Sequence, residues 1–248
     1  MGVTGFPDHP PTKVGAPIAD LSSGPFTALA IVSALMHRSR TGEGQTMDIS
    51  MQDCVWLLTA TYHLPTYFLD GVVPQRTGNA EANVTPFGVY PANDGAVMIV
   101  AIALAQLERL FTAMGREDLI NSPLCSQQSE RIKHREEIDA LINEWTKVRS
   151  VEEILRQLKH ADVPCSMVPT FDQVCNDPQI LSREMVVEVE QLVSGKVKAP
   201  GSVFKLSKTP GDVKFPAPFH GEHNFEVYNG LLGYTEQEIE QLTKDGLI

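Results

Sequence analysis

Two imidazoles and one carboxylate lie close together near the end of the chain, in the segment His220-Gly221-Glu222-His223. Side chains of these types are possible ligands for a metal ion. Their spacing differs from the i, i+4 pattern that places two histidines on one helix face, and Gly221 favours a loop. We therefore expect a structural or surface loop here and no metal site.

Two aspartates, Asp48 and Asp53, flank the point where an expected strand over residues 45–50 gives way to a helix. Ligands of open α/β sheets bind at such strand ends. The first turn of a helix also favours a carboxylate because of the helix dipole alone. The structural explanation is the better one, so neither aspartate is assigned to catalysis.

A run of small and polar residues follows Arg76, and a loop of this composition can approach a ligand closely. The candidates for this ligand-binding loop are Gly78, Asn79, Ala80, Glu81, Ala82 and Asn83. The run lacks the Gly-Lys-Ser/Thr ending of a P-loop. It serves equally well as a linker between two parts of the chain.

The cysteines do not form a metal or redox motif, because none lies in a CxxC pair. Four cysteines in 248 residues are too few for a disulfide scaffold. The apolar neighbours of Cys54, Cys165 and Cys175 predict buried, unreactive thiols. The four are Cys54, Cys125, Cys165 and Cys175. Reduced thiols indicate a cytoplasmic protein.

The first stretch of the chain is expected to contain an apolar helix over residues 26–36, buried on several sides. Ser22 or Ser23 would cap this helix, and Pro25 suits its first turn. Gly42 would follow its end.

A short strand over residues 45–50 is expected next, because its side chains alternate between polar and apolar. A second helix starts near Met51 and ends or kinks at Pro65.

A hairpin and three helices are expected in the middle of the chain. Strand-like runs over residues 87–90 and 97–101 flank Asp94-Gly95, a strong hairpin signal. Apolar stripes predict the first helix over residues 104–114 and the second over residues 132–145. The third helix follows the capping box at Ser150.

The last stretch is expected to hold strands over residues 185–189 and 203–206, separated by glycines, and a long loop over residues 210–218. A second capping box begins at Thr235. It opens a final helix that ends at Gly246.

Composition excludes several classes of protein. The chain is 42% hydrophobic and 21% charged, which indicates a globular protein. Its net charge of −11 disfavours nucleic acid and anionic membranes as partners. No apolar run reaches the roughly 18 residues of a membrane span, and the first residues do not resemble a signal peptide.

About eight short segments have the order and spacing of class III CoA-transferases, the CaiB/BaiF or formyl-CoA transferase family, and together cover essentially the whole chain. Thr4-Gly5-Phe6-Pro7-Asp8-His9-Pro10-Pro11-Thr12-Lys13-Val14-Gly15 resembles the family's TGxPDGPPTKVG. The segments similar to TGxGQxVDVSMxDA are Thr41-Gly42-Glu43-Gly44-Gln45 and Asp48-Ile49-Ser50-Met51-Gln52-Asp53. The other matches are Ala19-Asp20-Leu21, Arg76-Thr77-Gly78-Asn79, Pro86-Phe87-Gly88-Val89-Tyr90, Asp94-Gly95, Val163-Pro164-Cys165, Asp177-Pro178-Gln179, Gly201 and Gly221-Glu222-His223.

The resemblance implies an α/β fold with a Rossmann-like large domain built from both termini and a small α+β domain between them. In the family, two chains interlock as rings to form a dimer. Residues 1–78 would belong to the large domain, residues 79–161 would form the small domain, and residues 162–248 would return to the large domain. Only part of the Rossmann-like sheet would then lie in this chain.

The resemblance also implies transfer of CoA from an acyl-CoA donor to a carboxylic acid acceptor through an aspartyl anhydride and an aspartyl thioester. The CoA thioester is a substrate, and no bound cofactor or metal ion is implied. The family aspartate is expected in a region ahead of the TGxPD segment. No catalytic role is therefore assigned to Asp8, Asp20, Asp48 or Asp53, and the chain alone is expected to be inactive.

Two alternatives stay open. The first is an acyl-CoA racemase or epimerase of the same superfamily. The second is a non-catalytic fragment or a subunit of a split transferase, whose apolar helix over residues 26–36 would be exposed and would self-associate. The expected protein partner is a second copy of the chain or a missing N-terminal half.

Overall fold

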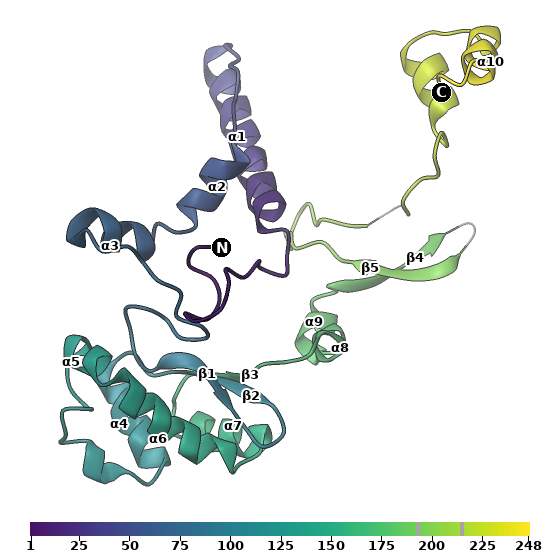
Figure 1. Ribbon diagram of the computed structural model, residues 1–248. Coiled ribbons are helices and arrows are strands. Elements are labelled where there is room, and N and C mark those ends of the chain that lie inside the picture. The colour runs from purple at the N-terminus through teal and green to yellow at the C-terminus, as the bar shows by residue number, and fades with distance from the viewer. Residues whose placement is uncertain (192–193, 214–215) are drawn as a thin grey trace. The chain divides into compact units, whose positions relative to one another are not determined.

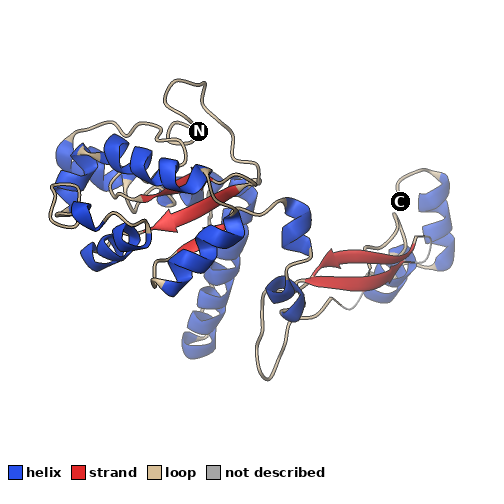
Figure 2. Cartoon of the chain, turned by 90° about the horizontal axis from the view of Figure 1, so that it is seen from below, coloured by secondary structure: helices blue, strands red, loops and turns tan. Residues whose placement is uncertain are grey.

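The computed structural model describes residues 1–191, 194–213 and 216–248. The chain divides into two compact units, Met1–Val168 and Pro169–Ile248, and each is described by itself (Figure 1). A three-stranded sheet lies in the first unit and a two-stranded sheet in the second (Figure 2). The three-part division expected from the sequence stays a prediction.

The first helix, α1 (Ile18–Thr41), is longer than expected. A start at Ser22 or Ser23 is wrong, because their hydroxyls donate to carbonyls one turn back inside the helix. Pro25 accordingly lies within the helix and not in its first turn. The end is as predicted: Gly42 has a φ of 82° and donates its N–H to the Arg38 carbonyl.

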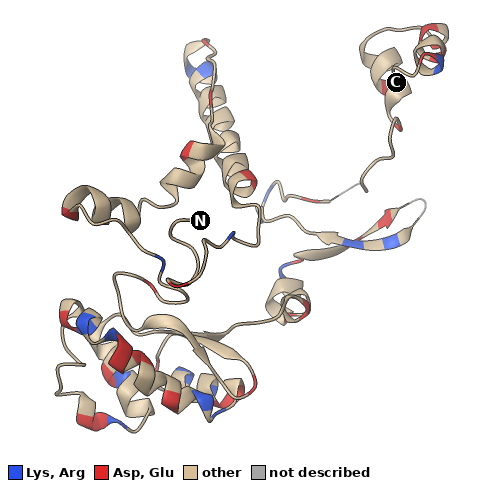
Figure 3. Ribbon diagram, viewed as in Figure 1, with Lys and Arg blue, Asp and Glu red and all other residues tan. Residues whose placement is uncertain are grey.

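By length and composition, α1 could cross a membrane, because an 18-residue window has a mean hydropathy of 1.4. The expectation that no segment meets this test is therefore wrong. Few charged residues lie along the helix, as the colours of Figure 3 show. None of its residues is buried within this chain. Core helices of soluble proteins pass the same test.

The expected strand over residues 45–50 is wrong, because residues 43–50 pair with no strand in the described part of the chain. Next comes α2 (Met51–Leu57), where the Ser50 hydroxyl accepts the Asp53 N–H at 3.3 Å. It ends before Pro65, which instead lies in the first turn of α3 (His63–Asp70), where a proline is tolerated.

The hairpin around Asp94-Gly95 is confirmed. The strands β1 (Phe87–Pro91) and β2 (Ala96–Val100) pair antiparallel, with Val89 opposite Met98. A third strand, β3 (Cys165–Met167), pairs antiparallel with β2 and brings a later part of the chain back to this sheet.

Helices cover this sheet and enclose the main core. They are α4 (Leu104–Ala113), the short 3-10 helix η1 (Glu117–Leu119), α5 (Gln128–Lys133), α6 (Arg135–Lys147) and α7 (Val151–His160). The helix expected over residues 132–145 is thus divided at His134. Ser150 caps α7 as predicted, since its hydroxyl accepts the Glu153 N–H. The fully buried core residues include Val97, Ile99, Leu107, Leu110, Phe111, Ile138, Ile142, Ile154 and Leu158.

The second unit opens with two short helices, α8 (Phe171–Cys175) and α9 (Pro178–Ser182). Its antiparallel strands are β4 (Val186–Gln191) and β5 (Gly195–Pro200). The expected strand over residues 203–206 is therefore wrong. Alternating lysines on β5 instead face glutamates on β4, with Lys198 opposite Glu188.

The last elements are a π-helix, η2 (Glu226–Leu231), and α10 (Glu236–Lys244). The capping box at Thr235 is confirmed, and Gly246 follows the end of α10 with a φ of 67°. The loop expected over residues 210–218 includes residues 214–215, which lie outside the described residues.

Candidate functional site

The candidate loop, residues 78–83, begins at a glycine that its surroundings require. Gly78 has a φ of 66°, and a Cβ there would lie 2.7 Å from the Phe6 ring. Its N–H donates to the Gly5 carbonyl at 2.9 Å. The loop therefore starts in direct contact with the N-terminal segment.

Arg76 strengthens this connection. Its guanidinium donates to the carbonyls of Phe6, Pro7 and His9 at 3.2, 3.0 and 2.7 Å. No acidic side chain is used; one arginine instead holds three carbonyls of the loop over residues 6–9. Two segments about 70 positions apart, both among those that carry the family resemblance, thus meet at one place.

The rest of the candidate loop lies along the edge of β1. Ala80 forms an isolated antiparallel bridge with Gly88. The Glu81 N–H donates to the Phe87 carbonyl at 3.0 Å, and the Val89 N–H donates to the Asn79 carbonyl at 3.2 Å. Residues 79–81 are thus fixed to the small sheet, and the proposed substrate or CoA role of the loop stays a prediction.

A small cavity of about 150 Å³ opens where this loop meets β1 and α6. The residues that line it are Thr77, Asn79, Ala80, Gly88, Val89, Tyr90, Asp139 and Asn143. The Tyr90 hydroxyl donates to Asp139 Oδ1 at 2.6 Å. Burial of the phenol and the nearby Asp139 carboxylate raise the pKa of Tyr90 far above its usual value.

The far end of the loop is held by two arginines on α5 and α6. Arg135 Nη2 donates to the carbonyls of Ala82 and Val84 at 2.9 and 3.1 Å. Arg131 is 3% exposed and donates to the carbonyls of Thr85, Ala101 and Ile102. Burial lowers the pKa of Arg131, so its hydrogen bonds must offset the loss of hydration.

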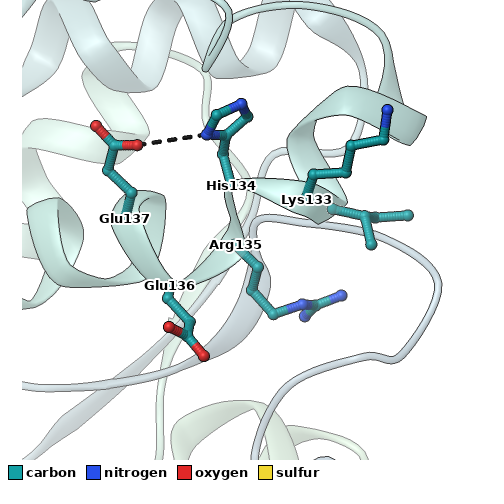
Figure 4. A pocket seen from close by; sticks show the side chains of 6 residues that line it. Lys133, His134, Arg135, Glu136 and Glu137 are labelled. Carbon is teal, nitrogen blue, oxygen red and sulfur yellow. Dashed lines mark ion pairs between the residues drawn. The ribbon is translucent and has the colours of Figure 1, made fainter.

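A second cavity, of about 430 Å³, lies at the junction of α5 and α6, and Figure 4 shows its side chains. Lys133 pairs with Glu130 at 2.7 Å, and His134 Nδ1 lies 3.4 Å from Glu137 Oε2. The side chains of Lys133 and His134 thus already have carboxylate partners within the chain. This arrangement favours a solvated surface depression and not an anion site.

The four aspartates of the N-terminal stretch differ in surroundings. Asp8 and Asp48 lie in segments without helix or strand. Asp53 lies in the first turn of α2, whose N-terminus Ser50 caps. Asp20 lies exposed in the first turn of α1, where no side chain caps the helix.

The start of α1 therefore offers free hydrogen-bond donors beside a carboxylate. The N–H groups of Ala19 and Asp20 have no acceptor among the residues that the structure describes, and neither has the Asp20 carboxylate a donor there. A helix N-terminus stabilises negative charge.

The segment His220-Gly221-Glu222-His223 forms a turn. Glu222 Oε2 accepts the Phe219 N–H at 2.7 Å, and His223 Nδ1 lies 3.2 Å from Glu226 Oε2. These contacts give the segment a structural role. Among the described residues, no group of three or more potential metal ligands is present.

All four cysteines are free thiols. Cys54 and Cys125 are buried, and Cys165 and Cys175 are half-buried. Burial raises the pKa of Cys125 and of Cys165, which disfavours the reactive thiolate. These observations agree with the expected unreactive thiols.

A model of CoA-transferase family III matches residues 1–224. The chain belongs to CoA-transferase family III. It is 35% identical over 241 residues to a succinyl-CoA–D-citramalate CoA-transferase of Chloroflexus aurantiacus, which covers 97% of this chain and 60% of that protein. It is 37% identical over 229 residues to a succinyl-CoA:mesaconate CoA-transferase of Haloarcula marismortui, covering 92% and 57%.

The solved structures agree. A CaiB/BaiF family protein from Brucella suis matches with a TM-score of 0.76 at 29% identity, over 93% of this chain and 60% of that one. The resemblance and the mixed α/β fold are thereby confirmed. This family III chain spans about 60% of the length of these relatives.

Sequence reasoning missed the three arginines that organise the site, Arg76, Arg131 and Arg135. Arginine in a sequence suggests a carboxylate or phosphate partner. Here the acceptors are backbone carbonyls, which exist at every residue and leave no pattern. Only Arg76 offered a signal, as the first residue of the Arg76-Thr77-Gly78-Asn79 match.

Proposed function

We propose that the protein carrying this chain transfers CoA from an acyl-CoA donor to a carboxylic acid acceptor. The observation that carries this proposal is the match to the CoA-transferase family III model over residues 1–224. Two relatives at 35% and 37% identity are named for succinyl-CoA with D-citramalate or mesaconate. We therefore expect succinyl-CoA as donor and a small dicarboxylic acid as acceptor.

The chemistry needs a carboxylate nucleophile. Its oxygen attacks the thioester carbon, the C–S bond breaks, and CoA leaves as the thiolate. The thiolate then attacks the enzyme's carbonyl in the anhydride, which forms an enzyme thioester and releases the donor acid. The acceptor carboxylate reverses both steps and leaves as the new acyl-CoA.

Asp20 is the residue of this chain that best suits the role of carboxylate nucleophile. It replaces the expected aspartate ahead of the TGxPD segment as the candidate. Its carboxylate is exposed and unpaired within the described residues, and it lies at the uncapped N-terminus of a 24-residue helix. The free N–H groups of that terminus suit the oxyanions that form on attack. Asp53 is the weaker candidate, because Ser50 already satisfies its helix terminus.

An Asp20→Asn variant tests this role. Loss of the nucleophile should lower the transfer rate from succinyl-CoA by about a thousandfold or more, as for other covalent catalysts. Asp53→Asn is the matched control and should retain transfer within about threefold. Full transfer by Asp20→Asn would remove the role from Asp20 and return it to a residue outside the chain.

The wild-type protein tests the reaction itself. Acyl transfer to mesaconate or citramalate, followed by mass spectrometry of the CoA esters, supports the transferase. Exchange of the α-proton for deuterium without transfer would instead identify a racemase.

The free thiols and the acyl-CoA substrate support a cytoplasmic location.

A further inference from the structure

We propose that Arg135 is a positioning residue that holds the candidate loop so that the backbone N–H of Asn83 faces away from the Arg135 guanidinium. The inference rests on the proposed transferase function, because it concerns a donor for that reaction. Arg135 is the first residue of α6, and its side chain leaves the helix start apart from the His134–Glu137 pair (Figure 4). One nitrogen reaches both the Ala82 and the Val84 carbonyl.

Because the peptide group is planar, the bond from Arg135 to the Ala82 carbonyl also fixes the direction of the next N–H group, that of Asn83. The carbonyl of one residue and the N–H of the next point in opposite directions in a trans peptide. Because the Ala82 carbonyl points at Arg135, the Asn83 N–H points away from it. That N–H has no acceptor among the described residues, and Asn83 is half-buried. It is therefore a fixed donor of the kind that stabilises an oxyanion.

The neighbouring contacts make the loop rigid. Arg131 holds the next carbonyl, of Thr85, and the Glu81 N–H is bonded to β1. One turn after Arg135, Asp139 accepts the Tyr90 hydroxyl, so α6 is bonded to β1 as well as to the loop. Arg135 is the part of this network whose removal frees Asn83 without breaking the core, since the residue itself is only half-buried.

The first readout of an Arg135→Ala variant needs no activity. Hydrogen exchange at the Glu81 and Val89 amides should become about fivefold to thirtyfold faster, the effect of losing one or two hydrogen bonds. Arg156→Ala is the matched control, because Arg156 is exposed on α7 and has no partner among the described residues. It should leave both amides unchanged.

The second readout is transfer by the whole protein. The kcat of Arg135→Ala should fall about tenfold to a hundredfold, because a misplaced donor acts in the transition state, while KM for acyl-CoA changes less than about threefold. Arg135→Lys should recover part of the rate. Unchanged exchange, or faster exchange with an unchanged kcat, would overturn the proposal. If the wild-type protein transfers no CoA, the transferase function fails, and with it the role proposed for Asn83, while the exchange result still measures the hold on the loop.

Discussion

Single residues hold this structure together through backbone carbonyls more than through ion pairs. Arg76, Arg131 and Arg135 each bind at least two carbonyls of a segment far away in the sequence. The ion pairs, by contrast, lie mostly at exposed positions, where each contributes little to stability. The positions of the loops over residues 6–9 and 82–85 therefore depend on the guanidinium groups of these three arginines.

Tyr90 offers a test at the scale of one hydroxyl. Its phenol is buried and donates to Asp139, so Tyr90→Phe removes a charge-assisted hydrogen bond. We expect the free energy of unfolding to fall by about 1.5–3 kcal/mol, measured by urea titration. The control is Tyr67→Phe, because Tyr67 is 52% exposed. It should change stability by less than about 0.5 kcal/mol.

The raised pKa of Tyr90 gives this test a pH dependence. The folded state favours the protonated phenol, so the stabilisation is complete below the ordinary tyrosine pKa of about 10. It is lost as the pH rises above that value. The wild-type protein should therefore lose stability more steeply above pH 10 than Tyr90→Phe does. Equal slopes would show that Asp139 and burial do not hold the proton.

Secondary-structure elements were predictable where local chemistry decides them. The Asp94-Gly95 hairpin and the caps at Ser150 and Thr235 follow from a few adjacent side chains. The strands expected over residues 45–50 and 203–206 failed, because a strand needs a partner that periodicity cannot supply. The candidate loop was found from its composition, but its attachment to β1 was not, because backbone hydrogen bonds leave no pattern in the sequence.

The cap of α10 gives a test at this scale. The Thr235 hydroxyl accepts the Glu238 N–H, while Glu238 accepts the Thr235 N–H at 2.8 Å. Thr235→Ala should destabilise the helix by about 1 kcal/mol and speed amide exchange along α10 about fivefold. Thr243→Ala, on the same helix, should not, because that hydroxyl only bonds back to the Ile239 carbonyl. Equal effects of the two variants would show that the cap does not stabilise α10.

At the scale of the whole molecule, α1 carries a large exposed apolar surface. Leu29, Val32 and Met36 are 63%, 54% and 60% exposed. Such a surface needs a cover, and we propose that a second copy of the chain or further parts of the protein supply it, in line with the interlocked dimer of the family.

This proposal predicts that the chain alone self-associates. Light scattering after gel filtration should show dimers or larger species, and the paired change Leu29→Glu with Met36→Glu should raise the monomer fraction severalfold. Ser39→Glu adds a charge at an exposed polar position of the same helix and should not. A wild-type monomer that melts cooperatively would contradict the proposal.

Oxygen labelling tests most directly whether CoA moves through a carboxylate of the protein. The whole protein, in excess over its substrates, would react once with succinyl-CoA and mesaconate labelled with ¹⁸O in both carboxylates. Mass spectrometry would then follow the label in the released succinate and in the peptide that carries the nucleophile. The anhydride mechanism predicts unlabelled succinate and one ¹⁸O in the enzyme's carboxylate, because the attacking oxygen of the acceptor stays on the protein when the new acyl-CoA leaves. Labelled succinate without ¹⁸O in the protein would show direct attack of the acceptor on succinyl-CoA and would contradict this mechanism.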